Sequence, residues 1–255
     1  MPKHLLPALL LALAASCTSV SVIPRYGGYD LGGHVGISSS GSPQKNDLKG
    51  IGLEDDSSVP GGRVDLEAGG THLTVAASDS SHGGSGTLQR TISEGGTTIP
   101  AGTAIDSEFD VTLVEGMVTW DLVPGDLVEA GIGLGVVVLD LDAEFTAPSL
   151  SATVATDEVL PVPVLALRAG LDLERFDVSA VLGAMDVHAG GDEIAVYDLD
   201  LMARFRVLGA AGRRIGAIVA GYRYVDAAAE YDDSDSDVDA VVRLSGPYIG
   251  ISLGF

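Results

Sequence analysis

The C-terminal residues 246–255 read GPYIGISLGF, and this stretch decides the fold class. Ile249, Ile251, Leu253 and Phe255 fall on one face of an extended chain, and small or polar residues alternate with them on the other face. A repeat of two residues is that of a β-strand. We therefore expect the chain to end in a strand with one apolar face and a terminal aromatic residue.

The same alternation recurs through most of the chain. It is clearest in residues 127–145, where Ile132, Leu134 and Val136 alternate with glycines. Ten such segments can be counted, which predicts an all-β protein. They cover residues 29–38, 62–68, 71–80, 108–123, 127–145, 159–173, 176–188, 194–208, 214–230 and 238–255.

The connections between these segments alternate in length. Tight turns at 69–70, 124–126, 174–175 and 209–212 are separated by long breaks at 39–61, 81–107 and 146–158 and by shorter polar breaks near 189–193 and 231–237. Short turns on one rim and longer loops on the other are typical of outer-membrane barrels. The pattern predicts a transmembrane antiparallel up-and-down β-barrel of ten strands, with eight strands as the alternative.

The composition combines high hydropathy with strong acidity. The chain is 46% hydrophobic, its mean hydropathy is +0.31, and its formal net charge is −22. An apolar surface in lipid and acidic loops in water would explain both values. The scarcity of cations argues against nucleic acid as a partner. After the N-terminal apolar run, the best candidate for a membrane-spanning helix is Ala130–Leu141, which carries three glycines and is too short.

The first residues have the pattern of an export signal. Lys3 precedes the apolar run Leu5–Ala15, which ends in a lipobox-like stretch before Cys17, the only cysteine. We expect a signal peptide over 1–17, a linker over 18–28 and the barrel over 29–255. Lipidation of Cys17 is the favoured interpretation, and ordinary cleavage that leaves a free thiol is the alternative.

Three stretches resemble small bacterial outer-membrane β-barrel proteins: the terminal strand 246–255, the glycine-alternating strand 131–138 and the loop 95–103. The resemblance covers about residues 29–255. It implies insertion into the lipid of the bacterial outer membrane, with the barrel-assembly machinery as a transient partner that reads Phe255. It implies no particular activity.

Charged residues gather on the strand face opposite the aliphatic one. Inside a ten-stranded barrel they would form an ion-pair network that fills the lumen or, alternatively, line a narrow pore. We therefore expect a barrel of structural or small-pore type. The network comprises Arg63, Asp65, Glu67, Glu115, Arg168, Asp172, Asp198, Asp200, Arg204, Arg206 and Arg223, with Asp30, His34, His72 and Asp177 on the same face.

Aromatic residues and an acidic run suggest contacts outside the lumen. Trp120, Phe176, Phe205 and Phe255 adjoin the short-turn rim, where membrane-interface aromatics are expected. The acidic run, residues 232–239, is interpreted as a solvated surface loop, with weak divalent-cation binding as the alternative. Its candidate ligands are Asp232, Asp233, Asp235 and Asp237.

One arrangement is similar to the catalytic pairs of omptins, ten-stranded outer-membrane proteases. It comprises Asp140 and Asp142 on one strand and Asp186 and His188 on another. In such a site a histidine acts as general base beside a carboxylate. Parity points both pairs outward, so we expect no catalytic residue. The sequence has no Walker-type or dinucleotide-binding loop, and we expect no cofactor. An outer-membrane hydrolase, omptin-like or lipid A-modifying, is one alternative, and a soluble lipocalin-like periplasmic lipoprotein is another.

Overall fold

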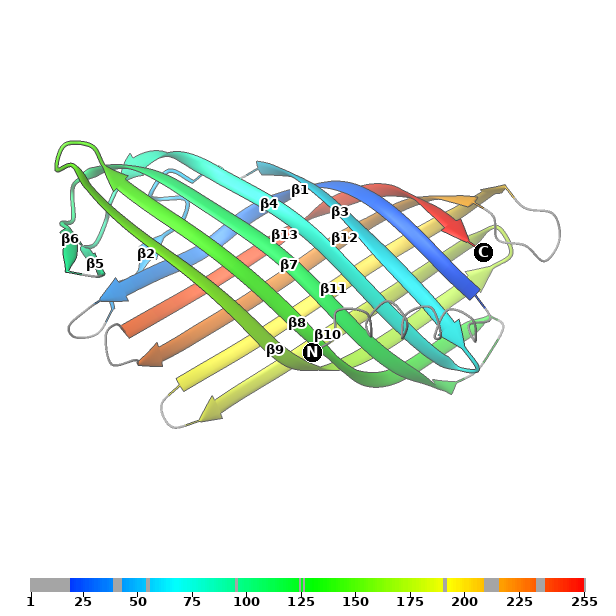
Figure 1. Ribbon diagram of the computed structural model, residues 1–255. Coiled ribbons are helices and arrows are strands. Elements are labelled where there is room, and N and C mark those ends of the chain that lie inside the picture. The colour runs from blue at the N-terminus through cyan, green and yellow to red at the C-terminus, as the bar shows by residue number, and fades with distance from the viewer. Residues whose placement is uncertain are drawn as a thin grey trace, which may run out of the picture.

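Ten long antiparallel strands form a closed ring in the computed structural model, which describes residues 19–38, 43–53, 56–94, 96–123, 125, 127–189, 192–208, 216–232 and 237–254 (Figure 1). Each strand pairs with its neighbour, and the first pairs with the last, so the predicted ten-stranded barrel is confirmed. In ring order the strands are β1 (Ser19–Ser38), β3 (Asp56–Ala68), β4 (Thr71–Thr87), β7 (Ala104–Val123), β8 (Val128–Ala147), β9 (Ala152–Leu173), β10 (Phe176–Ala189), β11 (Asp192–Leu208), β12 (Gly216–Asp232) and β13 (Asp237–Gly254).

Three short strands complete the described elements. β2 (Asn46–Asp47) pairs with β1, and β5 (Ile92–Glu94) forms a hairpin with β6 (Thr97–Ile99). Among the described residues, no helix is long and apolar enough to cross a membrane.

β1 begins ten residues earlier than the sequence pattern indicates. Residues 18–28 were expected to be a linker, but from Ser19 onward they belong to the barrel. Pro24 and the pair Gly27-Gly28 mask the alternation there. Pro24 has no N–H, and the ladder to β13 has paired residues at Val22 and Arg25 but none between them. The ladder to β3 continues through this interval, so the strand persists.

An apolar belt surrounds the half of the barrel nearest the short turns. Its side chains point outward and are about two-fifths to two-thirds exposed, as expected of residues that face lipid. A closed ring leaves no unpaired sheet edge, which is the condition for strands to cross a bilayer. The belt includes Val114, Trp120, Ile132, Leu134, Val136, Leu165, Leu167, Phe176, Leu201, Phe205, Ile218, Ile249 and Ile251.

The strands are longer than a bilayer requires, and their polarity inverts along their length. They have 13 to 22 residues, and β7 has 20, whereas a transmembrane strand needs about 9–11. Near the short turns, β7 points Trp120 outward and Glu115 inward; toward the other rim it points Glu108 outward and Phe109 inward. The outer half of the barrel therefore has the polarity of a protein wall in water.

This inversion corrects two expectations. The long breaks at 81–107 and 146–158 are largely strand, because β4, β7, β8 and β9 continue past the belt. Asp30 and His34 were expected in the lumen, but they lie on the outer surface of β1, where Tyr29 and Leu31 point inward instead.

Acidic side chains form a collar on the outside of the outer half. Cross-strand neighbours in the collar carry the same charge: Glu108 is opposite Glu144, and Asp142 lies between Asp110 and Asp157. Like charges directly opposite one another destabilise a sheet. The negative charge of the chain is thus concentrated in part where the strands leave the lipid.

Two segments, residues 43–53 and the β5–β6 hairpin with its flanks (residues 88–103), form a lid at the outer mouth. The hairpin contacts both β1 and β9, which lie five strands apart around the ring in either direction, so it crosses the mouth (Figure 1). A hydrogen bond of 2.7 Å from the Arg90 N–H to Asn46 Oδ1 joins the two segments. Each buries apolar side chains, namely Leu48, Ile51 and Leu53 from one and Leu88, Ile92 and Ile99 from the other.

The belt predicts that the stability cost of introducing a cation on the outward face of β8 depends on whether the position faces lipid. Leu134→Arg places a cation against the lipid and should reduce the free energy of unfolding by about 2–4 kcal/mol. Asp142→Arg, on the same outward face but in the collar, should cost little because it relieves the repulsion from Asp110 and Asp157. Urea unfolding from lipid vesicles, followed by Trp120 fluorescence, measures both. Equal costs for the two substitutions would contradict the position of the belt.

Glu94 in the lid predicts a dependence of lid docking on pH. Partial burial of its carboxyl raises its pKa, and the carboxylates of Glu158 and Asp157 raise it further. A raised pKa in the docked state means that docking is strongest at low pH and weakens as the pH rises through the raised value. Amide-exchange protection of residues 92–99, corrected for intrinsic rates, should fall over that interval. The Glu94→Gln variant should lose this dependence, and the collar variant Glu108→Gln should keep it; an unchanged profile in Glu94→Gln would refute the assignment.

Candidate functional site

A buried ion-pair cluster, here called the partition, crosses the lumen at about mid-height. Arg223 on β12 donates to Glu115 on β7 and to Asp198 on β11, with N–O distances of 2.5 and 2.6 Å. β12 and β7 are five strands apart around the ring in either direction, so the Arg223–Glu115 pair spans the barrel. All three side chains are at most 2% exposed.

Asp200 on β11 joins the rest of the partition. Its Oδ2 accepts from Arg25 on β1 at 2.8 Å and from Arg63 on β3 at 3.2 Å, and its Oδ1 accepts from the Tyr248 hydroxyl at 2.5 Å. The Arg25 guanidinium also lies over the Tyr248 ring, 5.0 Å from its centroid. Three guanidinium groups therefore face three carboxylates, which is the balance that buried charges require.

Gly221 makes room for the Tyr248 side chain. The two residues are direct partners across β12 and β13, and a Cβ at Gly221 would overlap the Tyr248 ring and hydroxyl. Tyr248 can lie against the barrel wall and reach Asp200 only because this partner has no side chain.

Apolar side chains fill the lumen between the partition and the lid. They come from every long strand of the ring except β4, and they form one continuous buried cluster with the lid residues. The largest members include Tyr29, Phe109, Met117 and Phe145. Two layers, the partition and this apolar packing, thus lie across the lumen beneath the lid.

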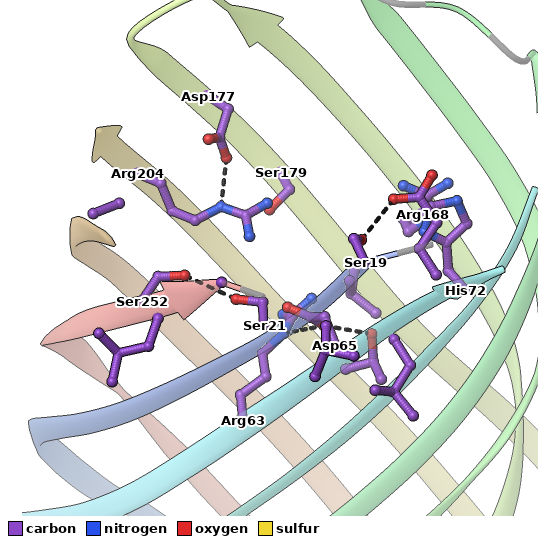
Figure 2. Close-up of a pocket in the computed structure, with 18 of the residues that line it drawn as sticks. Ser19, Ser21, Arg63, Asp65, His72, Arg168, Asp177, Ser179, Arg204 and Ser252 are labelled. Atoms are coloured by element: carbon purple, nitrogen blue, oxygen red, sulfur yellow. Dashed lines mark hydrogen bonds and ion pairs between the residues drawn. The ribbon is translucent and has the colours of Figure 1, made fainter. Parts of the chain in front are cut away.

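On the other side of the partition lies a chamber of about 920 Å³ that opens at the short-turn rim. Its walls carry four arginines and four acidic residues, with serine and threonine hydroxyls between them (Figure 2). The charged residues are Arg63, Arg168, Arg204, Arg206, Asp65, Glu67, Glu129 and Asp177. The chamber is thus polar, whereas the interior beyond the partition is apolar.

Ion pairs hold most of the chamber's charged side chains in place. Arg168 pairs with Asp121 and, at 2.5 Å, with Glu129. Arg204 pairs with Asp177 at 2.6 Å. Arg206 pairs at 2.7 Å with Asp172, and the Glu67 carboxylate accepts a hydrogen bond of 3.0 Å from Ser19. The residues expected in a lumen network therefore divide between the partition and the chamber.

Three residues of the interior were not predicted as site residues. Arg25 lies in the stretch interpreted as a linker, beside Pro24, so no alternation marked it. Tyr248 was placed on the polar face of the last strand, but its contact with Asp200 depends on the closure of the ring. Ser179 is a small polar residue on the inward face of β10, and its parity with Asp177 was the available signal.

The pairs similar to an omptin site do not come together. Asp140 and Asp142 lie on the outer surface of β8, and Asp186 and His188 on that of β10, with β9 between them. His188 is 64% exposed and pairs with Asp186 at 3.1 Å and with Glu193 at 3.3 Å. The outward parity expected from the sequence is the one observed, and the two pairs lie on strands that β9 separates.

The remaining predicted residues lie on the surface or beyond the described chain. Trp120, Phe176 and Phe205 point outward near the short-turn rim, and Phe176 pairs directly with Phe205. Cys17, Phe255, Asp233 and Asp235 lie outside the described residues, as do the side chains of Asp232 and Asp237. Within the described ranges, no three acidic, histidine or cysteine side chains are arranged to hold a metal ion.

No protein-family model and no curated protein matches the chain. Among solved structures it is similar to the outer-membrane protease OmpT from Escherichia coli, with 8% identity and a TM-score of 0.48 over 94% of this chain and 98% of that one. It is also similar to the transport unit of the autotransporter AIDA-I from Escherichia coli, with 11% identity and a TM-score of 0.40 over 97% and 96%. Neisserial surface protein A has 12% identity and a TM-score of 0.32 over 91% and 97%. These neighbours are bacterial outer-membrane β-barrel proteins, and the likeness is one of fold.

Proposed function

We propose that the protein is a closed, structural β-barrel of the outer membrane rather than a pore. The observation that carries this proposal is the partition, in which Arg223 and Glu115 join opposite walls of the lumen. A small solute entering from the chamber would have to break buried ion pairs, each of which is costly to disrupt. Beyond them it would meet dry aliphatic packing and then the lid.

In this proposal the barrel holds two surfaces at fixed positions relative to the lipid. The acidic collar stands above the belt on the outer side, and the polar chamber faces the periplasm. Lipid around the belt is the permanent partner, and the assembly machinery is a transient one. Divalent cations would be attracted to the collar by its charge. A catalytic role receives no support from the separated Asp140–Asp142 and Asp186–His188 pairs.

Conductance in planar bilayers tests the closed lumen. The refolded protein should insert without passing steady current in concentrated KCl. A variant in which a short glycine turn replaces residues 91–101 should also stay closed, because the apolar packing and the partition remain. A heat-modifiability gel on the same preparation verifies folding. A steady single-channel current from the unchanged protein would refute the closed barrel and favour the small pore.

The partition also predicts that two arginine substitutions differ widely in how much they lower the free energy of unfolding. Arg223→Gln leaves Glu115 and Asp198 buried without their cation and should lower the free energy of unfolding by about 3–5 kcal/mol. The matched control Arg243→Gln removes a pair with Asp226 from an arginine that is 49% exposed, and should cost at most about 1 kcal/mol. Urea unfolding from vesicles compares them. Similar small losses would show that the partition does not hold the barrel together.

A further inference from the structure

The chamber has hydrogen-bond donors that no described residue satisfies. Ser179 is only 8% exposed, and its hydroxyl is buried without a hydrogen-bond partner in the described chain. Arg204 uses only its Nε, in the pair with Asp177, so its two terminal nitrogens have no partner in the described chain. The Ser179 hydroxyl, buried without a partner, costs about 1–3 kcal/mol, and the Arg204 side chain beside it is 21% exposed. Both can donate to a ligand with acceptor atoms.

These donors lie side by side on one wall. Ser179 is on β10 and Arg204 on the adjacent β11, and both side chains face the chamber (Figure 2). Arg206 lies nearby but is already engaged by Asp172 and Asp177. A guanidinium fork beside a hydroxyl is an arrangement that suits a carboxylate.

The opposite wall offers an acceptor. Asp65 lies on β3, which is five strands from β10 around the ring in either direction. Its Oδ1 accepts from Arg63 at 2.8 Å and from Thr74 at 2.9 Å, while its Oδ2 accepts no hydrogen bond within the described chain. The Asp65 side chain is 23% exposed and lines the chamber. An ammonium group is the complementary partner for this oxygen.

We propose that the chamber binds a short peptide in its zwitterionic form. The peptide carboxylate is bound by Arg204 and Ser179, and its ammonium group by Asp65. Because the two anchors come from opposite walls, the ligand must be longer than a single amino acid, at about 3.3–3.6 Å per extended residue. The volume of about 920 Å³ lies within the usual range of small-molecule sites.

The charge of the chamber disfavours an anionic ligand. The lining carries four arginines and four acidic residues, but Arg63 also pairs with Asp200 in the partition, which leaves three arginines against four carboxylates. A phosphate would satisfy Arg204 and Ser179 but would leave Asp65 unmatched and bring uncompensated negative charge close to the partition. The partition lies across the far end, so the peptide enters and leaves at the periplasmic rim. Binding depends on the chamber side chains alone, and its test is separate from the conductance test.

Calorimetric titration of the folded, detergent-solubilised protein with trialanine tests the proposal. Trialanine should bind saturably, and trialanine amide and N-acetyl-trialanine should each bind about tenfold or more weakly, because each lacks one charge-assisted contact. Arg204→Gln should weaken trialanine similarly. Asp65→Asn should weaken trialanine but leave the affinity for N-acetyl-trialanine unchanged, since that peptide has no ammonium group.

Ser179→Ala separates binding from folding. It removes a hydroxyl without an intramolecular partner in the described chain, so the unfolding midpoint should stay the same or rise while trialanine affinity falls several-fold. The matched control Arg243→Gln, outside the chamber, should bind as the unchanged protein does. Absence of trialanine binding, equal affinity for the blocked peptides, or an unchanged affinity in Ser179→Ala would overturn the proposal. Inorganic phosphate that binds as tightly as trialanine would also overturn it, by showing a simple anion site.

Discussion

The ion pairs from Arg223 to Glu115 and Asp198 are the constraint on which the interior depends. They join β12 to β7 across the lumen and to β11 beside it, so the ring must close at a width that lets these side chains meet. Arg25 and Arg63 extend the connection to β1 and β3 through Asp200. Since each buried charge is costly without its partners, a change in strand number or register would leave several charges unpaired together.

The bilayer accounts for the second organising feature, the inversion of polarity along each strand. Where lipid covers the outside, the outward residues are aliphatic and charge is sequestered inside. Above the lipid, the same strands put Phe109 and Phe145 inside and carboxylates outside. The high hydropathy therefore reflects the lipid-facing half of the barrel, and much of the net charge of −22 reflects the half above the lipid.

Much of the wall follows from local sequence, and most of the interior does not. The alternation at 127–145 and the turns at 69–70 and 174–175 predicted the strand order, because both signals depend on neighbouring residues. The ends of the strands were harder to place, since Pro24 interrupts one pattern and the polarity inversion reverses the face of Asp30. Contacts such as Arg25 with Asp200 join residues far apart in the chain. Their identity depends on ring closure and strand stagger, which no local pattern contains.

The acidic collar gives the two halves of the barrel different responses to dissolved salt. Glu108 and Glu144 are direct cross-strand neighbours at the surface, as are Asp110 and Asp142, so mobile counterions lie within reach of their repulsion. At physiological ionic strength the Debye length is about 8 Å, and the collar is partly screened; in dilute medium the outer end of the wall carries the full repulsion. The partition side chains are at most 4% exposed, and buried pairs are screened much less than exposed ones. Osmotic dilution therefore acts on the exposed end of the barrel and little on the partition.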